Sequence, residues 1–306
     1  MRSKTARHPV SPSRGSSAAP LPARERFLRA NRYRVEREWN RYEGSAQRDL
    51  YRVLRERFLG RHVQPSPWAI DIGAGPGRFT GRLGSDIGHV VALDLSATAL
   101  RYLAERWAGR AAGPVPERVR GDGARPPFRA GSFGVVALLG NTLGFAEDRA
   151  DRVLAASLSL VAPSGRIVLE IAPGAGEISC YFARLPASSL GRLLRAPVPL
   201  LVQRVQREGF ATMADRRKSP GSFRRIDVDA ITAALSTSGF AVREAMAVAP
   251  ALGGKPERLE AVHGDAKAWD HLLELEETTG RSPDRFPRAA AVLVAAERTT
   301  SEHTIN

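Results

Sequence analysis

Hydrophobic residues follow two patterns along the chain, and the patterns alternate from about residue 66 onward. In the first, apolar residues stand in short continuous runs, which are typical of strands buried on both faces of a parallel sheet. In the second, they recur every three or four positions among charged residues, which is typical of amphipathic helices. The alternation predicts an α/β domain. Strands are predicted at residues 68–72, 90–93, 118–120, 133–139, 166–172, 240–248 and 289–297.

The helical pattern fills the connections between these runs. Two helices are predicted ahead of the first strand, and a crossover helix is predicted to begin over residues 79–84. One later helix opens at Asp227 and stops before Gly239, residues that are typical of helix starts and ends. That helix covers residues 227–238, and the other predicted helices cover residues 97–107, 153–160 and 257–279.

Three stretches depart from both patterns and set the expected boundaries. Residues 1–22 contain no acidic residue and are rich in Ser, Pro and Arg, which predicts a disordered tail, and residues 299–306 form a second tail. Residues 178–225 interrupt the pattern after the fifth strand. We therefore expect an N-terminal helical extension over residues 23–65 and one domain over residues 66–298 that contains the insertion.

A glycine-rich turn between two predicted strands is the clearest motif. The first apolar run leads into Gly73, Gly75 and Gly77, and the second run ends in Asp94. Such a turn lets a ligand approach the backbone closer than a Cβ would allow, and a carboxylate at the tip of the next strand accepts hydrogen bonds from ribose hydroxyls. The third glycine of the dinucleotide fingerprint would stand at position 78, which is Arg78. The motif is therefore a poor fit to pyrophosphate binding.

The run Asp71-Ile-Gly-Ala-Gly-Pro-Gly77 resembles a motif of the class I S-adenosylmethionine-dependent methyltransferases. The resemblance implies that S-adenosylmethionine is the cofactor and that the glycine turn faces its methionine part. It places Asp71 near the cofactor's amino group, Asp94 at the ribose and Asp122, in the turn after the third strand, at the adenine amino group. The cofactor-binding residues implied in this way are Asp71, Gly73, Ala74, Gly75, Gly77, Asp94, Leu95, Asp122, Gly123 and Asn141.

The same resemblance implies the fold. We expect a Rossmann-like α/β sheet of seven strands in the order 3-2-1-4-5-7-6, with strand 7 antiparallel and helices on both faces. N-terminal helices precede this sheet, and the insertion at residues 178–225, which follows strand 5, is where small-molecule members of the family build a substrate lid.

The charge distribution bears on the partner. The formal net charge is +14, but residues 1–65 carry +10 and residues 184–225 carry +8, whereas residues 66–183 carry only +1. Only four of the 46 basic residues are lysines, which indicates a coding bias toward arginine rather than selection for nucleic acid. We therefore expect a small-molecule substrate. The arginines of residues 184–225 favour an anionic one, unless they form a solvated face.

The loop after the fourth strand narrows the methyl acceptor. Nucleic-acid methyltransferases of this fold carry Asp/Asn-Pro-Pro-aromatic or Pro-Cys there, whereas Gly140-Asn-Thr-Leu143 resembles small-molecule N- and O-methyltransferases. Asn141 either orients a ligand or caps its own loop. Methyl transfer needs a base only when the acceptor must lose a proton, and Glu170 and His263 are the candidates, each with an ordinary structural role as the alternative. An RNA methyltransferase that uses the basic N-terminal helices, and a non-catalytic subunit of this fold, stay open.

Cysteine usage and hydropathy bear on the compartment. Cys180 is the single cysteine, so an internal disulfide is impossible, and no metal-ligand spacing surrounds it. No window reaches the roughly 18 apolar residues that a membrane-spanning helix needs. We expect a cytoplasmic protein with neither a metal nor a membrane partner, and the sequence does not indicate its oligomeric state.

Overall fold

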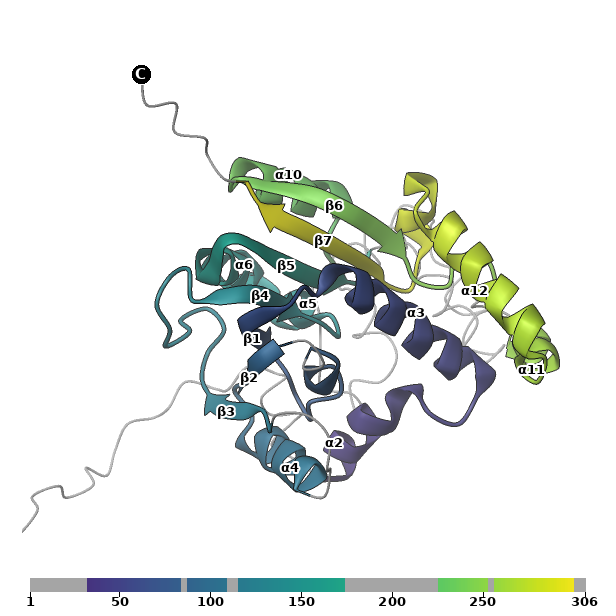
Figure 1. Ribbon diagram of the computed structural model, residues 1–306, viewed down its shortest axis with the longest axis horizontal. Coiled ribbons are helices and arrows are strands. Elements are labelled where there is room, and N and C mark those ends of the chain that lie inside the picture. Colours follow the sequence, from purple (N-terminus) through teal and green to yellow (C-terminus); the bar gives the residue numbers. More distant parts are fainter. Residues whose placement is uncertain (1–31, 84–86, 109–114, 174–224, 253–255, 300–306) are drawn as a thin grey trace, which may run out of the picture.

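The central layer of the structure is a seven-stranded sheet with the order β3-β2-β1-β4-β5-β7-β6 (Figure 1). The computed structural model describes residues 32–83, 87–108, 115–173, 225–252 and 256–299. Neighbours among β1 to β5 are parallel, and β7 is antiparallel to both β5 and β6. This topology confirms the predicted fold. The strands are β1 (Ser66–Ile72), β2 (Ile87–Asp94), β3 (Glu117–Arg120), β4 (Phe133–Leu138), β5 (Val161–Ile171), β6 (Phe240–Ala247) and β7 (Val292–Arg298).

The central strands β1 and β4 show why continuous apolar runs predict strands in this chain. Ile70 and Val136 belong to the core on one face of the sheet, and Ala69 and Val135 belong to the core on the other. All four are at most 1% exposed. Successive side chains of a strand point to opposite faces, so a strand covered on both sides needs an apolar residue at every position.

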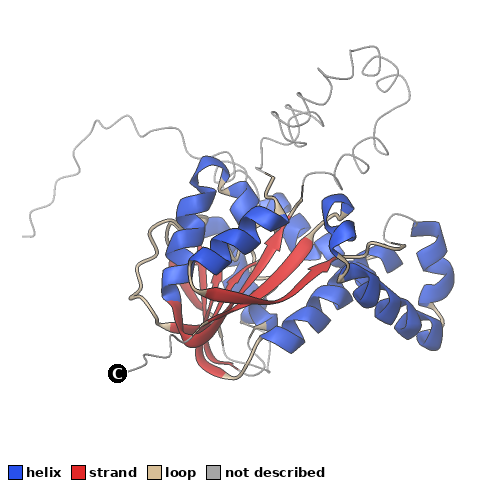
Figure 2. Cartoon of the chain, turned by 90° about the horizontal axis from the view of Figure 1, so that it is seen from above, coloured by secondary structure: helices blue, strands red, loops and turns tan. Residues whose placement is uncertain are grey.

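Helices cover both faces of the sheet (Figure 2). One face carries α6 and α10, whose Leu158 and Leu235 enter its core. The other carries α3, α11 and α12, which contribute Leu54, Leu259 and Leu272. The helices are α2 (Arg32–Trp39), α3 (Ala46–His62), α4 (Ala97–Trp107), α5 (Thr142–Phe145), α6 (Ala150–Leu160), α10 (Val228–Thr237), α11 (Pro256–His263) and α12 (Ala266–Gly280).

Two predicted helices differ from the structure. A helix is expected to begin over residues 79–84. The described part of this segment, residues 79–83, contains a 3-10 turn, η2 (Thr80–Arg82), and no α-helix. The helix predicted over residues 257–279 is two helices, α11 and α12. Asp265 separates them because its side chain accepts hydrogen bonds from the backbone N–H groups of Lys267 and Ala268, each at 3.0 Å, and thereby caps α12.

The strand β5 also begins earlier than predicted. It starts at Val161 and includes Ser164, whose φ of 57° marks the expected turn as an irregularity within the strand. The register with β4 shifts at the same place, between Phe133 and Val135.

Several sequence predictions lie outside the described residues. They include the tails at residues 1–22 and 300–306, Cys180, and the insertion at residues 178–225 except for residue 225. The domain boundaries stay predictions. Within the described ranges, no helix is long and apolar enough to cross a membrane.

Candidate functional site

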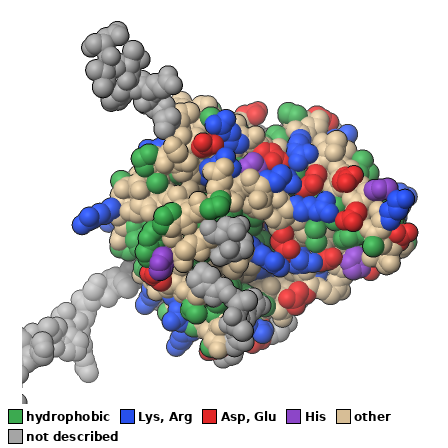
Figure 3. Space-filling view, viewed as in Figure 1, with side chains coloured by type: hydrophobic (Ala, Val, Ile, Leu, Met, Phe, Trp, Pro, Cys, Tyr) green, Lys and Arg blue, Asp and Glu red, His purple; other side chains and the backbone are tan. Residues whose placement is uncertain are grey.

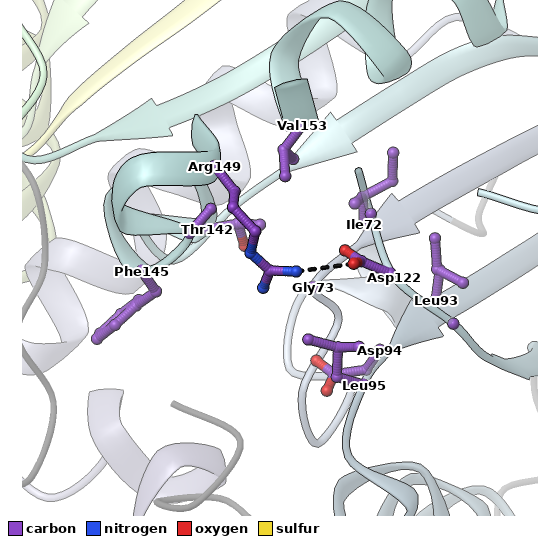
Figure 4. A pocket seen from close by; sticks show the side chains of 13 residues that line it. Ile72, Gly73, Leu93, Asp94, Leu95, Asp122, Thr142, Phe145, Arg149 and Val153 are labelled. Atoms are coloured by element: carbon purple, nitrogen blue, oxygen red, sulfur yellow. Dashed lines mark hydrogen bonds and ion pairs between the residues drawn. The ribbon is translucent and has the colours of Figure 1, made fainter. Parts of the chain in front are cut away.

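A pocket opens at the carboxyl ends of β1, β2 and β3 and is closed on its other side by α5 and the start of α6 (Figure 4). The space between its walls is about 540 Å³ when the open mouth is included. Five residues predicted from the motif line it together: Gly73, Asp94, Leu95, Asp122 and Gly123. This is the sheet edge at which open α/β sheets bind their ligands.

Gly73 shapes the floor of the pocket. Its N–H donates to the Leu93 carbonyl oxygen at 2.8 Å, which ties the turn to the end of β2. Its φ is 73°, and a Cβ at this position would lie 2.6 Å from Cγ2 of Thr142. Only glycine therefore allows the turn and the loop after β4 to approach this closely.

The Asp94 carboxylate is held in place from two sides. Oδ2 accepts a hydrogen bond from the Gly75 N–H at 2.8 Å, and Oδ1 accepts one from the Ser96 N–H at 2.8 Å. The residue is 4% exposed. Each carboxylate oxygen has a further lone pair, so the fixed group can accept additional hydrogen bonds from a ligand that enters the pocket.

Asp71 lies beneath the glycine turn instead of on the pocket wall. It is 2% exposed, and its Oδ2 accepts a hydrogen bond from the Thr80 hydroxyl at 2.7 Å. The bond connects the end of β1 to η2, so Asp71 fixes the path of the turn. Ala74, Gly75 and Gly77 likewise shape the turn without lining the pocket.

Asp122 carries the second carboxylate of the pocket, and an ion pair with Arg149 spans the space above it (Figure 4). Arg149 Nη1 lies 2.7 Å from Asp122 Oδ2, and Asp122 Oδ1 accepts from the Ala124 N–H at 3.0 Å. Arg149 comes from η3 (Glu147–Arg149), which directly precedes α6.

Sequence reasoning missed Arg149 and its neighbours on the same wall, Phe145 and Val153. The three residues stand four positions apart, directly after the loop that follows β4. This spacing places residues on one side of a helical segment and is the signal that could have found them.

Asn141 lies behind the pocket. Its φ is 62°, and its Oδ1 accepts a hydrogen bond from the Ala172 N–H at 3.2 Å. The side chain therefore ties the loop after β4 to the end of β5. Among its two expected roles, this contact favours the structural one.

Glu170 does not have the environment of a general base. It is 4% exposed, its Oε1 lies 2.6 Å from Nη2 of Arg55, and its Oε2 accepts from the Gly140 N–H at 3.0 Å. Burial alone would raise the pKa of Glu170, but the charge and the hydrogen bond of Arg55 outweigh burial and lower it. A carboxylate held in this way accepts a proton poorly near neutral pH.

His263 lies away from the pocket, contrary to the expected placement at the substrate side. Its Nε2 is 3.1 Å from Oδ2 of Asp49 on α3, and its ring packs edge-on against Trp269 of α12 with centroids 4.6 Å apart. The side chain is 41% exposed. His263 thus connects α11 to α3 and α12. The predicted single helix is broken after His263, and α11 packs on α3.

Within the described residues, no group of three or more His, Cys, Asp or Glu side chains is arranged to hold a metal ion.

Comparisons with known proteins add a family match over part of the chain and a fold. The family described as a methyltransferase domain matches residues 69–165. No curated protein matches the sequence.

Similar solved structures include magnesium protoporphyrin IX methyltransferase from Synechocystis PCC 6803 with bound SAM, at 13% identity and a TM-score of 0.53 over 93% of this chain and 100% of that chain. A SAM-dependent methyltransferase from Methanosarcina mazei is 14% identical with a TM-score of 0.52, over 79% and 96%. The [4+2]-cyclase SpnF is 13% identical with a TM-score of 0.50, over 82% of each chain. These likenesses show the fold.

Proposed function

We propose that the chain is a class I S-adenosylmethionine-dependent methyltransferase and that it transfers the cofactor's methyl group to a nitrogen or oxygen nucleophile of a small molecule. The observation that carries the proposal is the arrangement of the pocket. Asp122 follows β3, Asp94 ends β2 and Gly73 follows β1, and these strands are neighbours in the sheet.

The sheet order gives each residue its proposed role. Neighbouring strands lie about 4.8 Å apart, so the three positions form a row along which an extended ligand can lie. Asp122 accepts from the exocyclic amino group of adenine, Asp94 accepts from the ribose hydroxyls, and the turn at Gly73 leaves room for the methionine part. Phe145 and Val153 provide apolar surface for the base.

Catalysis by this chain rests on positioning. Bound S-adenosylmethionine supplies an activated sulfonium methyl, so the remaining requirement is an acceptor atom held in line at about 3 to 3.5 Å. The buried, hydrogen-bonded Asp94 fixes the ligand's ribose. Glu170 is paired with Arg55 and His263 contacts Asp49, so neither is supported as a general base. The acceptor in this proposal is therefore one that does not need a protein base to lose a proton.

The small-molecule assignment rests on two observations. The loop after β4 lacks the Pro-Pro and Pro-Cys signatures of nucleic-acid methyltransferases, and Asn141 in it is bound to β5. In addition, the substrate named for the Synechocystis enzyme, magnesium protoporphyrin IX, is a small molecule. The alternative to be tested is that the protein methylates RNA.

Calorimetry with S-adenosylhomocysteine tests the cofactor site. We expect the wild type to bind it and Asp94→Asn to weaken binding about tenfold or more, since a hydrogen bond to a charged group contributes about 1.5 to 3 kcal/mol. Asp270→Asn is the matched control and should bind S-adenosylhomocysteine as the wild type does. It removes an exposed carboxylate of α12 that pairs with Arg57 of α3. A wild type that does not bind the ligand would contradict the proposal and favour a non-catalytic role for the fold.

Transfer of a labelled methyl group tests the acceptor class. The protein is incubated with S-[methyl-13C]adenosylmethionine and either a small-molecule extract or total RNA, and the product is read by carbon chemical shift. We expect label on nitrogen or oxygen in the small-molecule fraction. Label in RNA, with a rate that falls steeply with salt, would support the RNA alternative instead.

A further inference from the structure

Arg78, directly after the glycine turn, is a largely buried guanidinium whose ion pair with Glu38 is long. Its side chain is 16% exposed and lies between two rings, with Cζ 4.5 Å from the centroid of Tyr42 and 4.6 Å from that of Phe79. Nη1 donates to the Glu38 carbonyl oxygen at 2.5 Å, whereas the Glu38 carboxylate is 3.9 Å away. Within the described residues, the buried Nε makes no hydrogen bond.

A second guanidinium shows what full compensation looks like in the same place. Arg55 stacks on the Tyr42 ring, at 4.7 Å from its centroid, and is paired with Glu170 at 2.6 Å. Tyr42, Arg55, Arg78 and Glu170, which we call the guanidinium cluster, therefore hold two positive charges and one negative charge. The Glu38 carboxylate nearby is paired more closely with Arg41, at 2.8 Å. Burial lowers the pKa of Arg78, which reflects the cost of its poorly compensated charge.

The cluster lies at one end of the row of ligand positions. A Cβ on Gly140, at the carboxyl end of β4, would be 3.5 Å from Arg78 Nη2. In the sheet, β4 follows β3, β2 and β1, so this point is about three strand spacings, or roughly 14 Å, from Asp122. A ligand with its base at β3 and its ribose at β2 brings its far end to Arg78.

We propose that Arg78, supported by the guanidinium cluster, is a binding site for one carboxylate beside the pocket, at the β1–β4 end of the row of ligand positions. A guanidinium offers parallel N–H donors that match a carboxylate, and an anion here would complete the charge balance. The carboxylate belongs either to the methionine part of the cofactor or to the acceptor. The inference rests on the proposed function, and the experiments below separate the two sources.

The first experiment changes the ligand. Calorimetry compares S-adenosylhomocysteine with 5′-deoxy-5′-(3-aminopropylthio)adenosine, which differs only by loss of the carboxylate. If the cofactor supplies the anion, the wild type binds the first about 10- to 100-fold more tightly. In Arg78→Gln the ratio falls to near one. Arg82→Gln, an exposed neighbour paired with Glu56, is the control and keeps the wild-type ratio.

The second experiment asks whether the acceptor supplies the anion. Acetate is titrated into protein saturated with S-adenosylhomocysteine, and the melting temperature is recorded. If the acceptor supplies the anion, the two adenosine compounds bind the wild type equally well. Acetate then raises the melting temperature of the wild type and of Arg82→Gln but not of Arg78→Gln. Arg78→Lys, which keeps the charge and loses the planar fork, serves where the glutamine variant fails to fold.

A ligand ratio that Arg78→Gln leaves unchanged, together with no acetate effect that depends on Arg78, overturns the inference. If the wild type binds neither adenosine compound, the proposed function fails. The anion site is then tested by titrating acetate into the free protein. A rise in melting temperature that is lost in Arg78→Gln would support the site, and no rise in the wild type would refute it.

Discussion

Arg55 and Glu170 form a buried ion pair, with Nη2 and Oε1 2.6 Å apart and both side chains 5% exposed. Arg55 belongs to α3 and also donates to the Tyr51 carbonyl oxygen at 2.8 Å, while Glu170 belongs to β5 and also accepts from the Gly140 N–H. The pair thus connects the N-terminal extension to the strand and loop that border the pocket. Figure 3 shows that blue basic and red acidic side chains also intermix on the surface over α3, α11 and α12, where pairs are solvated and contribute less.

We predict that Glu170→Gln destabilises the fold. Removal of one partner leaves the Arg55 charge buried, which costs about 3 to 5 kcal/mol in comparable cases. Denaturant unfolding measures the loss, and Glu274→Gln, an exposed acid on α12, should change stability by about 0.5 kcal/mol or less. A variant of unchanged stability that has lost only its turnover rate would instead restore Glu170 as a general base.

Glu244 predicts how stability depends on pH. Its carboxylate contacts His62 Nε2 at 2.6 Å, Arg61 Nη2 at 3.1 Å and Arg281 Nε at 3.0 Å. Burial alone would raise the pKa of Glu244, but the hydrogen bonds with His62 and Arg61 outweigh burial and lower it to about 2 from its ordinary value of 4.5.

A carboxyl group with a lowered pKa stabilises the fold at pH values above its unfolded pKa and loses this contribution as the pH falls toward the folded pKa. We therefore expect the free energy of unfolding to fall between about pH 4.5 and 2, and to fall less steeply in Glu244→Gln. Denaturant titrations at several pH values measure both slopes. Equal slopes would show that other carboxyl groups dominate acid unfolding.

The fold was predictable because its signals are local and repeated. Consecutive residues of β1 and β4, such as Ala69–Ile70 and Val135–Val136, are apolar, as burial on both faces requires. Asp94 and Gly73 stand where a strand ends. The partners of Glu170 and His263 were not predictable. Arg55 is 115 residues from Glu170 and Asp49 is 214 residues from His263, so neither contact leaves a pattern in the local sequence.

Gly77 predicts a packing cost that a second glycine can isolate. Its φ is 84°, and an added Cβ would lie 2.5 Å from Cδ1 of the buried Leu103. Gly44 has a φ of 86° with nothing within 4 Å of an added Cβ. We expect Gly44→Ala to cost about 1 to 2 kcal/mol from the backbone alone, and Gly77→Ala about 1 to 3 kcal/mol more. Denaturant unfolding of the two variants gives the difference, and equal losses would show that Leu103 moves aside freely.

Asp122 and Arg149 predict the base specificity of the pocket. An ionised carboxylate only accepts hydrogen bonds, so Asp122 suits the 6-amino group of adenine and opposes the 6-oxo group of hypoxanthine. Its pairing with Arg149 at 2.7 Å keeps one oxygen oriented, while the side chain is still 35% exposed toward the pocket. We predict that S-inosylhomocysteine binds the wild type at least about tenfold more weakly than S-adenosylhomocysteine.

Asp122→Asn should reduce this discrimination, because an amide can also donate to the oxo group. Asp148→Asn changes an exposed acid one residue before Arg149 and should leave the ratio of the two affinities unchanged. Calorimetry of both ligands with the three proteins measures the ratios. Arg149 is held through Asp122, so Arg149→Ala in the Asp122→Asn background should add no further loss of affinity. An equal affinity ratio in Asp122→Asn and in the wild type would show that Asp122 does not recognise the base.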